Sequence, residues 1–127
     1  MSSGFNSSAG LNVSGSKVFQ KNVSLAPVEI SSAASITIDA SLGNVFYLLL
    51  GTSPTFNAPT NPTNGQQLTI IVEHSANNNV ATWNAVWLFP GGVDAVLSTA
   101  SGKIDLVCAV YHSDIGGWLT TFAKGLA

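Results

Sequence analysis

The stretch TNPTNGQQLTIIVEHSANNNVATWNAVWLFPGG, residues 60–92, contains the turn and strand signals that decide the fold. Asn64-Gly65 predicts a tight turn with left-handed backbone positions directly before a strand over residues 67–74. An Asn-rich reversal at residues 77–79 and the corner Pro90-Gly91-Gly92 bound the short apolar runs that follow. Because no recognisable reactive group lies in this stretch, it predicts a structural surface and not a catalytic one.

The rest of the chain continues this pattern of short apolar runs separated by turn residues, and no segment has a helical period. It predicts an all-β domain with strands over residues 17–25, 34–39, 44–50, 67–74, 80–83, 86–89, 103–112 and 118–123. Pro54, Pro59 and Pro62 exclude a helix or a central strand between them. No sequence period of about 20 to 50 residues repeats, so neither a solenoid nor a propeller is expected.

Residues 1–16, MSSGFNSSAGLNVSGS, form a Ser-, Gly- and Asn-rich tract with isolated apolar residues and no strand or helix period. We expect either a disordered tail or an arm that becomes ordered against a neighbouring subunit. The sequence therefore divides into an N-terminal arm over residues 1–16 and a β domain over residues 17–127.

Two of the expected strands have apolar residues on both faces. The runs over residues 45–50 and 106–111 are continuously apolar, whereas Ile36 and Ile38 alternate with polar neighbours in a strand with one wet side. A strand that is apolar on both faces lies between a core and a second cover. In a domain this small, another subunit is a plausible source of that cover.

The composition of the 127 residues supports the same expectation. Hydrophobic residues make up 46% of the chain and charged residues only 8%, where about 25% is typical of soluble domains. A surface with so few charges favours oligomerisation. The chain has four scattered lysines, no arginine and a net charge of -2, so no nucleic-acid partner is expected; its apolar runs fall far short of a membrane span, so no membrane partner is expected either.

Candidate catalytic residues exist, but none belongs to a recognisable motif. Glu73 and His74 are strand neighbours that point to opposite faces, which leaves His74 as an edge or interface residue. His112 and Asp114 provide two metal ligands without a third. The sole cysteine, Cys108, is interpreted as a small core residue. No enzyme activity, metal or cofactor is expected; the acid and base candidates are His74, His112, Glu73, Asp94, Asp105 and Asp114.

The aromatic residues have two possible roles. They are interpreted first as packing residues in the core or at a subunit interface, and second as a platform on which a carbohydrate stacks. Trp83 and Trp87 lie four positions apart, so they share a strand face unless Asn84 and Ala85 break the register. The packing and interface candidates are Phe46, Trp83, Trp87, Phe89, Tyr111 and Trp118.

The order of these corners and strands resembles a small β domain of tailed-phage virion proteins, among them tail fibres, spikes, baseplate parts and capsid decoration proteins. The resemblance covers about residues 30–123 and is carried by residues 61–66 (NPTNGQ), Thr82-Trp83, residues 89–92 (FPGG), Leu97, Asp105 and Gly117-Trp118. It implies a jelly-roll-like antiparallel β-sandwich that assembles as a homotrimer, without catalytic activity or cofactor.

The expected function is therefore that of a virion protein: a trimeric capsid decoration, or cement, protein that binds the major capsid protein. Three weak contacts made by one trimer bind far more tightly than one contact. The residues expected to touch the capsid or a neighbouring subunit are Phe5, Leu11, Val13, Val18 and Phe19. The alternative is a tail fibre or baseplate component that binds host surface glycans through exposed loops; a glycan-degrading enzyme is disfavoured because no carboxylate motif is present.

Overall fold

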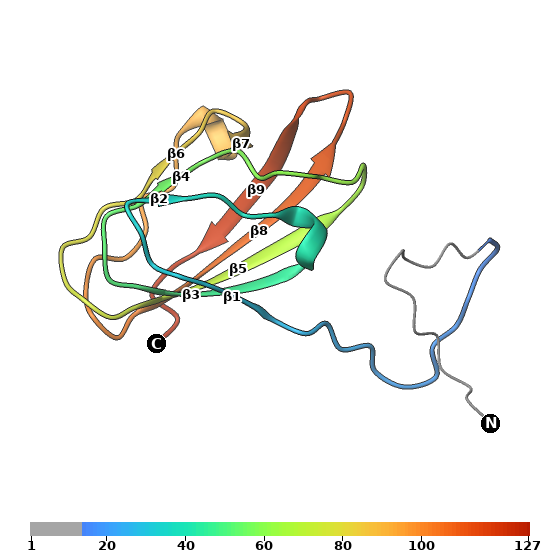
Figure 1. Cartoon of the computed structure of the whole chain (residues 1–127), viewed down its shortest axis with the longest axis horizontal. Helices are drawn as coiled ribbons and strands as arrows, with labels where there is room; N and C mark the ends of the chain where they lie inside the picture. The colour runs from blue at the N-terminus through green and yellow to red at the C-terminus, as the bar shows by residue number, and fades with distance from the viewer. Residues whose placement is uncertain (1–13) are drawn as a thin grey trace.

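Residues 14–127 are described by a computed structural model, in which the strands form a six-stranded and a three-stranded sheet (Figure 1). The predicted all-β class is confirmed. The strands are β1 (Val28–Ile30), β2 (Ser35–Ile36), β3 (Val45–Leu50), β4 (Thr55–Phe56), β5 (Gln67–His74), β6 (Thr82–Trp83), β7 (Trp87–Leu88), β8 (Ile104–His112) and β9 (Gly117–Ala123), with short 3-10 turns η1 (Ala40–Leu42) and η2 (Pro90–Gly92).

The first six strands alternate between the two sheets. The strands β1, β3 and β5 pair in parallel in the large sheet, and β2, β4 and β6 pair in parallel in the small one. The chain thus winds through three coils like a short parallel β-solenoid. The expected antiparallel pairing is wrong for this part of the chain, and so is the expectation that no solenoid-like winding occurs. The arrangement of two sheets is consistent with the expected sandwich.

The sequence does not reveal these coils because their lengths differ. In the large sheet, Val28 pairs with Phe46 and Phe46 with Ile70, so successive coils advance by 18 and 24 residues. In the small sheet, Thr55 pairs with Ser35 and with Thr82, which gives advances of 20 and 27 residues. Loops of unequal length remove the fixed period by which a repeat is recognised.

The last strands complete the large sheet in a different way. Strand β8 pairs antiparallel with β5 and with β9, and β7 adds to β9 in parallel. The strand order is β1-β3-β5-β8-β9-β7, so the large sheet is mixed. The long strands β5, β8 and β9 lie side by side and carry most of its area (Figure 1).

The core fills the space between the two sheets. Phe46 and Ile70 point into it from the large sheet, and Phe56 and Trp83 stack with ring centroids 4.4 Å apart on the small-sheet side. Each such side chain stabilises the fold by about 1.5–3 kcal/mol relative to exposure. Of the aromatic candidates, Tyr111 is half-buried and contacts Trp118, and the rest lie in the core: Phe46, Trp83, Trp87, Phe89 and Trp118.

The strand expected over residues 17–25 is not formed, and this expectation is wrong. This linker segment, as we call residues 17–25, has no strand partner within the described chain, and Val18 and Phe19 are 86% and 73% exposed. Within residues 14–127, the first that pair in a strand are Val28–Ile30. In Figure 1 the segment runs away from both sheets.

The proline-rich stretch does contain a central strand, contrary to expectation. Strand β4 directly follows Pro54 and lies between β2 and β6 in the small sheet. Pro54 lies before the first residue of the strand, so its missing N–H falls outside β4, and its carbonyl oxygen accepts a hydrogen bond from the N–H of Thr82 at 2.9 Å. A two-residue strand bounded by prolines has no pattern long enough to be recognised.

The turn before β5 uses one left-handed residue, not two. Gly65 has a φ of 82°, whereas the φ of Asn64 is not positive. The N–H of Gln66 donates to Thr63 O at 2.9 Å and closes the turn. The Oδ1 atom of Asn64 instead accepts from the N–H of Ser113 at 3.0 Å and ties this turn to the β8–β9 hairpin.

The corner after β7 is the short turn η2, whose backbone is kinked at Gly91. Pro90 begins η2, and Gly91 and Gly92 both have left-handed backbone angles, with φ of 67° and 71°. Such angles are costly for residues with a Cβ, which accounts for the two consecutive glycines.

Candidate subunit interface on the large sheet

The side of the large sheet that faces away from the core is predominantly apolar. Along β3, β5 and β8, residues alternate between full burial in the core and partial exposure on this side. The prediction that two strands are apolar on both faces is confirmed. We call this side the outer sheet face; its apolar members are Val45, Tyr47, Leu49, Ile71, Ile104, Leu106, Cys108, Val110 and Leu119.

Three of these residues are strongly exposed. Leu49, Val110 and Leu119 have 46%, 40% and 49% of their surface accessible to solvent. Single exposed apolar residues need no explanation, but a contiguous apolar group on one sheet face marks an interaction site. The outer sheet face is therefore the candidate functional site.

A shallow hollow lies in the middle of the outer sheet face. Strand register places Thr69, Cys108 and Thr121 side by side in one row across the sheet. These small side chains are flanked by the larger Val110 and Leu119, and the hollow between them has a volume of about 300 Å³. Cys108 lies on its floor, half-buried, and the expectation that it is a core residue is wrong.

Cys108 was misplaced because both sides of β8 are apolar. The residues that enter the core are Val107 and Ala109, so Cys108 shares the opposite side with Leu106 and Val110. A sequence with apolar residues on both faces does not indicate which face is the inner one.

The outer sheet face carries negative charge from Glu29 and Glu73. The Tyr47 hydroxyl donates a hydrogen bond to Glu73 Oε1 at 2.8 Å. This bond, then partial burial, then the negative charges of Glu73 and Glu29 raise the pKa of Tyr47 above its ordinary value of 10.0. A cationic partner would thus be favoured over an anionic one.

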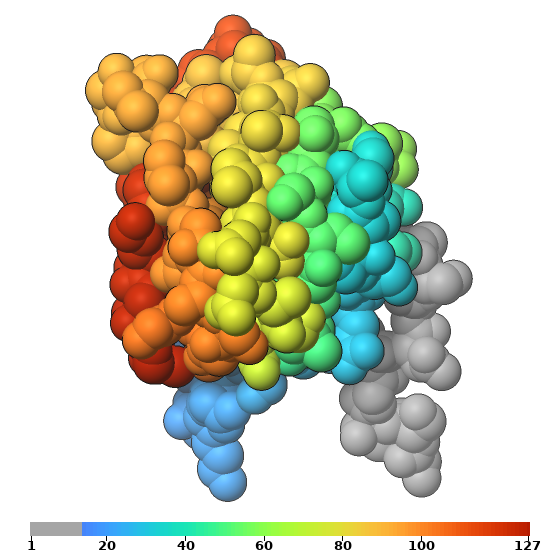
Figure 2. All heavy atoms as spheres, turned by 90° about the vertical axis from the view of Figure 1, so that its left-hand side faces the viewer, coloured from blue at the N-terminus to red at the C-terminus, as the bar shows by residue number. Residues whose placement is uncertain are grey.

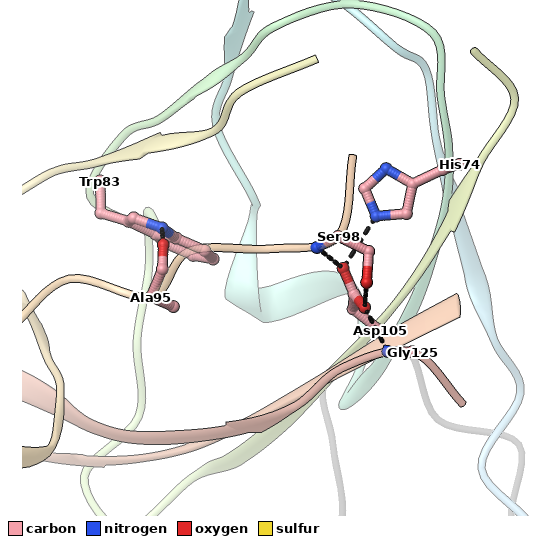
Figure 3. A network of polar contacts seen from close by, with 6 residues as sticks. All are labelled: His74, Trp83, Ala95, Ser98, Asp105 and Gly125. Atoms are coloured by element: carbon pink, nitrogen blue, oxygen red, sulfur yellow. Dashed lines mark hydrogen bonds and ion pairs between the residues drawn. The ribbon is translucent and has the colours of Figure 1, made fainter. Parts of the chain in front are cut away.

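A second cluster of polar groups is buried at the end of the core. The Asp105 carboxylate accepts from His74 Nε2 at 2.8 Å, from Ser98 N–H and Oγ at 2.8 and 2.7 Å, and from Gly125 N–H at 2.9 Å (Figure 3). His74 is only 2% exposed, so its assignment as an edge or interface residue is wrong. Burial of the carboxyl would raise the pKa of Asp105, but the bonds from Ser98, Gly125 and His74 outweigh burial and lower it.

We call the Asp105 carboxylate together with His74, Ser98 and Gly125 the clasp, because these groups hold three segments of the chain together. Ser98 Oγ donates to Asp105, and His74 also bonds Asp105 and not Ser98, so the groups are not in the serine–histidine order of an activated serine nucleophile. The carboxylate instead joins three segments: the end of β5, the loop before β8 and the C-terminal tail. The sequence contains one indication of this cluster. Asp105 lies two and four positions before Val107 and Ala109, so all three point to the same, inward side of β8.

The remaining metal candidates belong to the β8–β9 turn. The Nδ1 atom of His112 accepts from the backbone N–H of Asp114 at 3.2 Å, which engages the imidazole in local turn geometry. Among residues 14–127, no three His, Cys, Asp or Glu side chains are placed to hold a metal ion. No helix in this same part of the chain is long and apolar enough to cross a membrane.

The residues expected to touch a capsid or a subunit fall in two groups. Val18 and Phe19 lie on the exposed linker segment, which projects from the body in Figure 2. Phe5, Leu11 and Val13 lie outside the described residues.

Comparison with protein-family models, with curated proteins and with solved structures gives no match for this chain. Function is therefore argued from the chemistry and geometry of the outer sheet face and the linker segment.

Proposed function

We propose that this chain is a structural protein of a tailed-phage virion, a capsid decoration protein that assembles as a homotrimer through the outer sheet face. One observation carries the proposal: the large sheet has a second apolar side that residues 14–127 leave uncovered. Obligate subunit interfaces are apolar in this way because they are buried throughout the life of the protein.

The composition of the surface supports assembly further. With only 8% charged residues, the chain has few groups that keep separate molecules apart. Burial of Leu49, Val110 and Leu119 between subunits would remove exposed apolar surface from water, at about 25 cal/mol per Å².

The N-terminal arm supplies the contact with the major capsid protein. It precedes the linker segment, which projects from the body with exposed apolar side chains, so this connection would let the arm reach a surface beyond its own domain. A trimer presents three arms, and each additional contact is made at high effective concentration. The combined binding stabilises the shell even when a single arm binds weakly.

The alternative, a tail component that binds host glycans, has less support. Sugar rings stack on exposed aromatic faces, but Trp83, Trp87 and Trp118 all point into the core. The Asn-rich turn at residues 77–79 remains as a polar loop for a glycan.

The proposal is tested with shells of the parent phage and two forms of the protein, the full chain and a chain lacking residues 2–16. We expect the full chain to co-sediment with shells and the deletion to lose at least about tenfold in apparent affinity, because avidity multiplies the loss of each contact. Equal binding of both forms would rule out the arm as the clamp. Binding to a glycan array with none to shells would favour the tail component.

A further inference from the structure

The linker segment has the sequence pattern of a strand but no partner strand among the described residues of its own chain. If residues 17–25 are extended, Phe19, Val23 and Leu25 lie on one side together with Lys17 and Lys21, and the other side is polar apart from Val18. All three apolar side chains on that side are exposed, by more than half of their surface. A one-sided apolar pattern that stays exposed indicates a binding segment whose partner lies elsewhere.

The linker segment leaves the sheet at the level of the hollow. Strand pairing places Val28 in one row with Phe46, Ile70 and Val107. The next row toward the linker segment contains Val45, Thr69, Cys108 and Thr121, of which the last three line the hollow. The segment therefore begins beside this row, at the β1 edge of the sheet.

The hollow is large enough for side chains of the linker segment. Its volume is about 300 Å³, and a cavity of about 150 Å³ already accommodates a benzene ring. Its rim is formed in part by Val110 and Leu119, which suits an aromatic ring such as that of Phe19.

The charges of the linker segment and of the outer sheet face also favour binding between them. Lys17 and Lys21 give the linker segment a charge of +2, and since the chain has a net charge of -2, the rest of it carries -4. The outer sheet face contributes Glu29 and Glu73 to that negative charge. Cationic side chains on both sides of Phe19 would thus meet a face with negative charge.

We propose that the linker segment of one copy docks on the outer sheet face of a second copy, with Phe19 in the hollow above Cys108. This proposal rests on the self-association part of the proposed function. A second copy is the occupant because the segment runs away from both sheets of its own chain (Figure 1), and Pro27 favours an extended backbone at the residue before it. The arm ahead of the linker segment remains free to reach the shell.

The single cysteine of the chain provides the test, since Cys108 lies on the floor of the hollow. A Phe19→Cys/Cys108→Ser variant carries a thiol only on the linker segment, and the wild-type chain carries one only on the face. When the two full-length chains, with tags of different size, are co-assembled and mildly oxidised, a mixed disulfide forms only between different copies. The matched control is Val96→Cys/Cys108→Ser, because Val96 is 65% exposed but lies on the loop before β8.

We expect the mixed disulfide to form at least about tenfold faster with the Phe19 variant than with the Val96 control, because docking raises the effective thiol concentration to the millimolar range. Equal rates would overturn the proposal. So would exclusive intramolecular closure in a Phe19→Cys chain that retains Cys108, since the segment would then lie on its own face. A stable oligomer with no selective crosslink overturns this inference alone, whereas a monomer at all concentrations overturns the proposed function as well.

Discussion

The two faces of the large sheet are built from similar residues but meet different surroundings. On the inner face, Ile70 and Trp118 are almost fully buried by the small sheet and its loops. On the outer face, Leu49 and Leu119 remain about half exposed. Within residues 14–127, the chain covers only one side of the large sheet. We propose that another copy covers the second side.

The sharpest test of this comparison uses neighbours on β9 that point to opposite faces. Trp118→Ala is expected to lower the free energy of unfolding by about 3–5 kcal/mol, because it leaves a large cavity in the core. Leu119→Ala is expected to cost less than about 1 kcal/mol in the subunit and to weaken association instead. Chemical denaturation at two protein concentrations separates these effects, because only association depends on concentration.

If Leu119→Ala lowered the free energy of unfolding more than Trp118→Ala at low protein concentration, the assignment of the two faces would be contradicted. Trp118→Phe serves as a milder variant if the alanine variant does not fold.

Substitution of the buried Asp105 carboxylate is expected to have the next largest effect on the free energy of unfolding. Asp105→Asn is expected to lower the free energy of unfolding by about 3 kcal/mol, because an amide has one acceptor oxygen for four donors and leaves buried groups unpaired. Ser98→Ala keeps the carboxylate and is expected to cost about 1 kcal/mol. Urea denaturation measures both, and Asp114→Asn at an exposed turn is the control with no expected effect.

The same carboxylate makes stability depend on pH. Because the folded-state pKa of Asp105 lies below its ordinary value of 3.8, its contribution is complete above that value and is lost as the pH falls through the folded-state pKa. The difference in unfolding free energy between wild type and Asp105→Asn is thus expected to shrink at acid pH below about 4. A difference that stays constant from neutral to acid pH would show that the carboxylate charge is not what holds the clasp.

The smallest effect concerns the outer face itself. Glu73→Gln removes the carboxylate that accepts from Tyr47, so the pKa of Tyr47 is expected to fall toward its ordinary value of 10.0. Ultraviolet titration at alkaline pH reports this change, and Tyr47→Phe assigns the signal because the chain has only two tyrosines. An unchanged titration would indicate that Tyr47 and Glu73 do not interact in solution.

The sequence predicts the all-β class and the two-sided strands because the continuous apolar runs of β3 and β8 and the turn residues between strands are local properties. It does not predict the coils, because pairing of Phe46 with Val28 and Ile70 joins segments separated by loops of unequal length. It also places Cys108 on the wrong side, since apolar residues on both faces of a strand do not identify the core. The hollow and the clasp could not be predicted from the sequence, because both depend on the register between strands that are far apart along the chain.

The mass of the chain in solution tests the central claim, that the outer sheet face is covered by other copies, most directly. Sedimentation equilibrium of the full chain is expected to give about three times 13.1 kDa, and Val110→Glu/Leu119→Glu is expected to reduce it to a monomer because it buries charge between subunits. Val80→Glu/Val96→Glu, two exposed sites outside this face, should remain trimeric. A wild-type chain that is monomeric at every concentration would contradict the account.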